Sequence, residues 1–156
     1  MTKQNSVRII PLGGVGEVGK NMTVIEYGEE IIVIDCGLSF PREDMLGVDY
    51  VIPDAAYLKK NKEKIKAVLI THGHEDHIGA TPYLLQDLGA PVYGTDLSLA
   101  LIETKLAERK IEGLDFNIIK PGDTINAGLF KIEAIQVNHS IDAALGFAIH
   151  TPIGIL

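Results

Sequence analysis

The stretch Thr71-His72-Gly73-His74-Glu75-Asp76-His77-Ile78-Gly79 decides how the rest of the chain is interpreted. It contains three of the chain's five histidines, with an aspartate directly before the last of them. Neutral imidazoles and carboxylates are common ligands of zinc and similar cations, and packing alone gives no reason to crowd them into one turn. The apolar residues 67–70 before the turn predict a buried strand. We therefore expect a strand whose C-terminal end opens into a metal-binding loop.

Composition places the chain among ordinary globular domains. It has 156 residues, 46% of them hydrophobic, which is enough for one domain with a core. No apolar run approaches the ~20 residues that span a bilayer, and residues 1–6 lack the apolar segment of a signal peptide. The single cysteine, Cys36, excludes an internal disulfide and suits a reducing cytoplasm. A net charge of −7 argues against non-specific binding to nucleic acid.

Hydrophobic periodicity and turn residues predict a mixed α/β (α+β) chain. Residues 22–27 and 31–35 are rich in β-branched side chains and should pair as a hairpin across Gly28. Residues 36–50 should form a long loop. Helices are expected over 53–64, from 81 to a stop at Gly89, and over 97–112. Further strands are expected over 7–12, 67–71, 91–94, 116–119, 124–127, 130–137 and 146–150.

A glycine-rich loop near the N-terminus matches the dinucleotide fingerprint in its letters. The motif is Gly14-x-Gly16-x-x-Gly19, and Asp35 lies at roughly the expected distance after it. That fingerprint requires a helix at the last glycines, whereas the β-branched residues 22–27 favour a strand. We therefore expect no nucleotide cofactor. The loop would serve close backbone packing, or Gly14 and Gly16 would face a substrate phosphate beside the metal site.

The spacing within the histidine-rich stretch indicates two groups of ligands. His72 and His74 are one residue apart, so in an extended turn both can point the same way. Asp76 and His77 follow after the chain has turned, and they can address a second point. One cluster could therefore serve two cations.

Two residues outside the stretch, His139 and Asp35, bear on the same site, and a third, His150, does not. His139 follows the strand predicted over 130–137, where it could complete the coordination of the first cation. Asp35 ends a buried strand, and a carboxylate buried there needs a partner. We expect it to hold the second nitrogen of a ligating histidine, although capping the turn at Gly37 is the alternative. His150 lies within a strand and needs no ligand role.

These motifs resemble a known family. The pattern His72-x-His74-x-Asp76-His77, with Asp35 upstream and His139 downstream, is similar to that of the metallo-β-lactamase superfamily. Residues 11–21, 40–54 and 71–79 together resemble bacterial ribonuclease J, of the β-CASP branch. The resemblance covers nearly the whole chain, and it implies the N-terminal part of an αββα sandwich.

The resemblance also implies a function. Family members are metal-dependent ribonucleases that degrade RNA from the 5′ end and also cut internally, in mRNA decay and in RNA maturation such as rRNA processing. By analogy, His72, His74 and His139 would hold one Zn²⁺, and Asp76 and His77 would help to hold another, with Mn²⁺ or Mg²⁺ as alternatives. Asp76 and a metal-bound water would carry the hydrolysis. RNA would be the substrate, no membrane would be involved, and the protein would act as a homo- or hetero-oligomer.

The resemblance also indicates what lies outside residues 1–156. The family has an aspartate that bridges both metals on a strand after residue 150, and it has a β-CASP domain and a C-terminal oligomerisation domain. We therefore expect this chain to be the N-terminal portion of a metallo-β-lactamase domain and to be inactive alone. Two alternatives stay open, namely another hydrolase of the same fold and a non-catalytic partner subunit of a ribonuclease. The lysines of residues 59–66 should form a solvated helix face, with contact to an RNA backbone as the lesser alternative.

Overall fold

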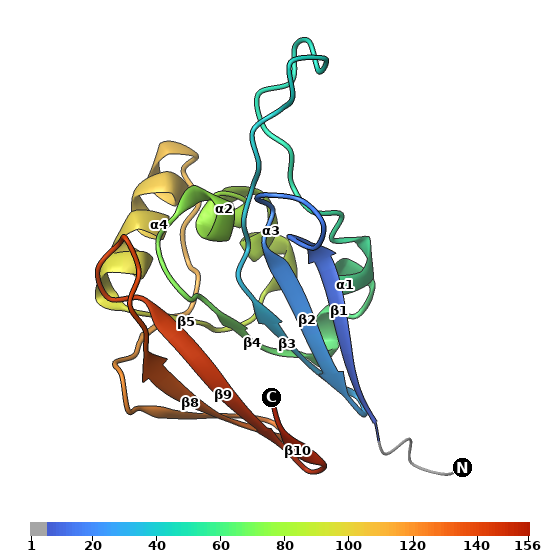
Figure 1. Cartoon of the computed structure of the whole chain (residues 1–156), viewed down its shortest axis with the longest axis vertical. Coiled ribbons are helices and arrows are strands. Elements are labelled where there is room, and N and C mark those ends of the chain that lie inside the picture. The colour runs from blue at the N-terminus through green and yellow to red at the C-terminus, as the bar shows by residue number, and fades with distance from the viewer. Residues whose placement is uncertain (1–5) are drawn as a thin grey trace.

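Two β-sheets packed face to face, with helices on one side, form the body of the molecule (Figure 1). This computed structural model describes residues 6–156. One sheet has six strands in the order β1-β2-β3-β4-β5-β6, and the other has four in the order β10-β9-β8-β7. The predicted mixed α/β class is confirmed.

The chain enters the six-stranded sheet as an antiparallel meander and continues as parallel strands. β1 pairs with β2, and β2 with β3, in antiparallel fashion, whereas β3 to β6 are mutually parallel. Parallel neighbours need crossover connections, which here contain helices. The elements are β1 Val7–Gly13, β2 Met22–Tyr27, β3 Glu30–Ile34, α1 Ala56–Lys60, η1 Lys62–Lys64, β4 Ile65–Leu69, α2 Glu75–Ile78, α3 Thr81–Leu88, β5 Val92–Gly94, α4 Asp96–Glu108, β6 Phe116–Ile118, β7 Thr124–Ala127, β8 Phe130–Gln136, β9 Leu145–Thr151 and β10 Gly154–Ile155.

Alternation along the central strands divides the core into two layers. Val33 of β3 and Val68 of β4 pack toward the helices, where α1, α2, α3 and α4 all contribute buried side chains. Ile32 and Leu69, one residue away on the same strands, pack against the four-stranded sheet. The far face of that sheet carries exposed side chains such as Lys131 of β8. The described residues therefore form three of the four layers of an αββα sandwich.

Most predicted elements are confirmed, and the differences are shifted element ends and one additional short helix. The helix expected over 53–64 begins at Ala56, where the Asp54 carboxylate accepts a hydrogen bond from the Ala56 amide, and it changes to a 3₁₀ turn after Asn61. α4 ends at Glu108 rather than near 112. The histidine-rich stretch, expected to be a loop, contains the short helix α2.

The region after the glycine-rich loop is a strand, not a helix. Met22–Tyr27 is β2, paired on both sides within the sheet. Without a helix at this place the dinucleotide interpretation fails, as the β-branched residues predicted. The long loop after β3 projects from the body as an arm, closed at its base by a bridge between Ser39 and Val51 (Figure 1).

Candidate metal centre

The C-terminal ends of two parallel strands build the floor of the site. β3 and β4 are neighbours, so the residues that follow them emerge at the same edge of the sheet. Asp35 follows β3, and its amide donates to the Leu69 carbonyl at 2.8 Å. Its backbone has a φ of +61°, a left-handed conformation that is uncommon for a residue with a side chain. This turn sends the buried Asp35 carboxylate toward the loop after β4.

Backbone hydrogen bonds fix the α2 turn above that floor. The Cys36 amide donates to the His77 carbonyl at 2.8 Å, and the Leu38 amide donates to the Glu75 carbonyl at 3.1 Å. Between them, Gly37 passes so close that a Cβ there would lie 1.6 Å from the Asp76 carbonyl oxygen. A glycine is required at this position because only a residue without a side chain allows that approach.

Three histidines from two distant segments meet at one point. The ring nitrogens of His72, His74 and His139 include one from each residue that lie within 4.8 Å of one another. His72 Nε2 is 3.1 Å from His74 Nδ1, and the His139 ring centroid is 4.3 Å from that of His72. Three nitrogens around a tetrahedral zinc would be about 3.3–3.4 Å apart, from Zn–N bonds of ~2.0–2.1 Å. Small side-chain adjustments would therefore seat a cation here, and the donor set suits zinc.

His72 is prepared to act as a neutral donor. Burial lowers its pKa to about 4, with a further contribution from the neighbouring His77, His139 and His74. Its Nδ1 contacts the Thr71 hydroxyl at 2.9 Å, which orients the ring. Because the ligand form of histidine is the neutral one, an imidazole kept unprotonated near pH 7 suits a metal site.

The predicted partner of Asp35 is His77. Asp35 Oδ2 lies 2.7 Å from His77 Nδ1. Burial raises the pKa of the Asp35 carboxyl, against hydrogen bonds from His77 and Thr71 that lower it. Burial lowers the pKa of His77, but the hydrogen bond and charge of Asp35 outweigh it, so that the pKa is raised. The contact with Asp35 is made by Nδ1, which leaves Nε2 on the opposite edge of the His77 ring.

Asp76 and His77 form a second group of candidate metal ligands. Asp76 Oδ2 is 3.4 Å from His77 Nε2, and the Asn21 side-chain amide nitrogen is 3.0 Å from the first and 3.2 Å from the second. Asp76 and His77 thus lie side by side, and the His77 ring centroid is 4.0 Å from that of His72, so the pair adjoins the histidine trio.

The other singled-out residues lie apart from this centre. His150 is on β9, and its Nε2 lies 3.1 Å from Glu133 Oε1. Lys59 of α1 and Lys64 of η1 pair with Asp87 and Glu29, each at 2.7 Å, as expected of a solvated surface.

Sequence reasoning missed two side chains of the site. Thr71 donates its backbone amide to Asp35 Oδ1 at 2.8 Å, and its hydroxyl contacts Asp35 Oδ2 at 2.8 Å. Asn21, at the end of the glycine-rich loop, contacts Asp76 and His77. Thr71 was within reach of prediction because it precedes His72, but nothing in the local sequence of Asn21 indicates where its side chain points.

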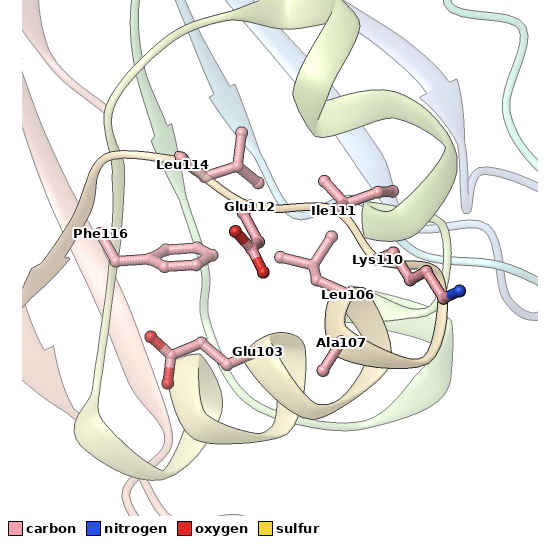
Figure 2. Close-up of a pocket in the computed structure, with 9 residues that line it drawn as sticks. Glu103, Leu106, Ala107, Lys110, Ile111, Glu112, Leu114 and Phe116 are labelled. Atoms are coloured by element: carbon pink, nitrogen blue, oxygen red, sulfur yellow. The ribbon is translucent and has the colours of Figure 1, made fainter.

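One cavity lies in another part of the fold, away from the predicted ligands. It encloses about 510 Å³ between the C-terminal end of α4 and β6, and Leu106 and Phe116 supply apolar walls (Figure 2). The Glu103 and Glu112 carboxylates face it (Figure 2). None of the predicted ligands lines it, so it is not the metal centre.

The sandwich and the clustered donors at one end of it are those of a known class, and the chain belongs to the metallo-beta-lactamase superfamily, whose family model matches residues 15–149. Within that class, the chain is similar to ribonuclease J. It is 49% identical over 156 residues to ribonuclease J of Helicobacter pylori, covering 99% of this chain and 23% of the relative. It is 44% identical over 158 residues to that of Synechocystis, covering 99% and 25%. The chain therefore spans about a quarter of the length of the curated relatives it matches.

A solved structure supports the fold at low sequence similarity. A protein of unknown function from Enterococcus faecalis superposes with a TM-score of 0.70 at 17% identity, covering 94% of this chain and 41% of that one. Separately, no helix within residues 6–156 combines the length and apolar character needed to cross a bilayer.

Proposed function

We propose that this chain is the metal-binding part of a zinc-dependent ribonuclease. The observation that carries the proposal is the meeting of His72, His74 and His139, since it takes ring nitrogens from two separate segments to within 4.8 Å of one another. A pair formed by Asp76 and His77 lies next to it. The first three residues would hold one Zn²⁺ and the other two would help to hold a second, with Mn²⁺ or Mg²⁺ as alternatives.

Cations bound there would lower the pKa of a coordinated water and offset charge on phosphate oxygens. The residues of the chain supply the framework. Asp35 holds the His77 ring by its Nδ1, which leaves Nε2 as a donor. Asp76 would be the carboxylate that receives a proton from the attacking water. Half-exposed, it also borders a groove of about 480 Å³ with Val18 and Phe40, which gives a substrate strand access.

RNA is proposed as the substrate because of the similarity to ribonuclease J. By the same analogy the whole protein would degrade RNA from the 5′ end and cut internally, would act in the cytoplasm and would form oligomers through other regions. Gly16, exposed and with open space at its Cβ position, would let the glycine-rich loop approach a phosphate, next to Gly14. The chain itself carries a net charge of −7, so much of the basic surface for RNA would come from outside it.

The test uses the full-length protein encoded by the gene that carries this sequence. Purified protein is stripped of metal, reloaded with Zn²⁺ or Mn²⁺, and given 5′-monophosphorylated RNA. We expect metal-dependent RNA degradation, and we expect His72→Ala to reduce it by at least ~10³-fold, the scale of losing a metal ligand's contribution to catalysis.

His150→Ala is the matched control, because this histidine lies on β9 away from the trio. It should retain full activity. Metal-loaded protein that leaves RNA intact but hydrolyses a thioester or lactam would overturn the proposal in favour of another hydrolase. Protein that binds metal, cleaves nothing and stimulates a second ribonuclease would identify a partner subunit instead.

A further inference from the structure

The glycine-rich loop delivers one side chain to the metal centre, that of Asn21. Its Nδ2 lies 3.0 Å from Asp76 Oδ2, 3.0 Å from the Asp76 carbonyl oxygen and 3.2 Å from His77 Nε2. Its main chain is fixed as well, because the Asn21 amide donates to the Asp76 carbonyl at 2.9 Å and its own carbonyl accepts from the Gly37 amide at 3.0 Å. The Asn21 amide group is thus held next to the two candidate metal-binding atoms, Asp76 Oδ2 and His77 Nε2.

The Asn21 side-chain amide contacts the two atoms that would bind the second cation, Asp76 Oδ2 and His77 Nε2. With its Nδ1 toward Asp35, His77 presents an Nε2 lone pair, and Asn21 Nδ2 is a donor that can use it. Asp76 Oδ2 is an acceptor for the same amide group. The carboxylate oxygen Asp76 Oδ2 keeps a second lone pair for a cation while it accepts from Asn21, whereas His77 Nε2 has one lone pair, so a cation bound there would replace the Asn21 contact.

The Asn21 side chain does more than fix the position of the α2 turn. The Asn21 backbone amide already bonds the Asp76 carbonyl, so the side-chain contact with that carbonyl repeats an existing link. The contacts with Asp76 Oδ2 and His77 Nε2 are made by the side chain only. These two contacts act on the donor atoms of the site rather than on the fold around them.

The loop makes room for this arrangement. A Cβ on Gly14 would lie 2.4 Å from Asn21 Oδ1, and Gly14 has a φ of +82° that favours glycine. A side chain at Gly14 would therefore displace the Asn21 amide. This gives part of the dinucleotide-like motif a role that involves no nucleotide.

We propose that Asn21 is a positioning residue of the second cation site, which it prepares by holding the Asp76 carboxylate beside His77 Nε2. The inference rests on the proposed metal centre and concerns only its second position. Partners that orient metal ligands typically contribute about 10–100-fold to metal affinity. Loss of the Asn21 amide should therefore weaken one cation site by that factor and leave the histidine trio unchanged.

The test is a titration of the metal-stripped, full-length protein with Zn²⁺, followed by calorimetry, and with Mn²⁺, followed by electron paramagnetic resonance. The variant is Asn21→Leu, which keeps the approximate side-chain volume and removes the amide. Asn126→Ala, at an exposed position of β7, is the control. We expect two sites in the wild type and in the control, and a loss of about 10-fold or more at one site in Asn21→Leu. Asn21→Ala should give the same pattern should leucine disturb folding.

A structural role would shift both affinities together or lower the melting temperature of the metal-free protein without changing the ratio of the two affinities, and either result would overturn the inference. Two unchanged sites in Asn21→Leu would also overturn it while leaving the proposed ribonuclease intact. A wild-type protein that binds no cation would overturn the proposed metal centre itself, and this inference with it.

Discussion

Asp35 Oδ2 and His77 Nδ1 are 2.7 Å apart, across the seam between the end of β3 and the α2 turn. The contact links Asp35, at the end of β3, to His77, a candidate metal ligand in the α2 turn. Thr71 completes the arrangement by donating its amide to the other oxygen of the same carboxylate at 2.8 Å. A single buried acid therefore orients both the loop that carries His72 and the ring of His77.

Replacing Asp35 with asparagine should damage the site more than the fold. An amide NH₂ facing His77 Nδ1 favours the tautomer with its proton on Nε2, which removes that lone pair from a cation. We expect a 10–100-fold loss of affinity at one cation site and a loss of about 1–3 kcal/mol in the free energy of unfolding. Calorimetric titration and urea unfolding measure the two. Asp87→Asn, in an exposed pair with Lys59, should change neither.

Gly37→Ala should displace the α2 turn. The added Cβ would lie 1.6 Å from the Asp76 carbonyl oxygen, so the loop after β3 and the turn must separate. We expect a loss of about 1–3 kcal/mol or more in unfolding free energy, as for other forced overpacking, together with weaker binding at the second cation site. In Gly146→Ala the nearest atom would be the Val137 Cγ1 at 3.2 Å, and the effect should be smaller. Equal losses in the two variants would contradict the role given to Gly37.

Acid should weaken the fold in part through Glu26. Burial raises the pKa of this carboxyl, but hydrogen bonds from Tyr57 and Arg8, the latter at 2.6 Å, outweigh it and the pKa is lowered. A group with a lowered pKa stabilises the folded state above its unfolded pKa of about 4.3, and this stabilisation is lost as the pH falls through the folded value.

Urea unfolding of the wild type and of Glu26→Gln between pH 6 and 3 tests this. The wild type should be the more stable above about pH 4.3, and the difference should shrink on further acidification. A difference that grows toward low pH would show that the shift has the opposite sign.

Cys36 should be inert to thiol reagents in the folded protein. It is fully buried, and burial raises the pKa of its thiol, so that thiolate is scarce near pH 7. We expect an aromatic disulfide reagent to react at the rate of unfolding in native buffer and at once in concentrated urea. Immediate stoichiometric reaction without denaturant would contradict the packing described for the turn after β3.

The fold was largely accessible from the sequence because its strands are marked by strong local patterns. The run Ile31–Ile34 alternates between two buried faces, so it is apolar throughout, and Gly89 stops α3 with a φ of +63°. α2 was missed because four residues are too few to show helical periodicity. Its position also depends on hydrogen bonds from the Cys36 and Leu38 amides, which come from another part of the chain.

The candidate site likewise contains residues that the sequence could predict and residues that it could not. The spacing of His72, His74 and His77 was visible because the residues are close in the chain, and the structure brings His139 to His72 and His74 from the far end. Asn21 could not be placed from the sequence, since its direction depends on how the glycine-rich loop passes over α2. Contacts between loops are set by the surrounding fold, and no local periodicity records them.

The histidine trio has a mechanical consequence. His72 and His74 follow β4 of the six-stranded sheet, whereas His139 follows β8 of the four-stranded sheet. A cation held by all three would act as a crosslink between the two halves of the sandwich. By mass action such a ligand stabilises the closed form by about 2.7 kcal/mol at a hundred times its Kd. Its occupancy would then be recorded as slowed amide exchange where the sheets meet, because the halves could no longer separate without releasing it.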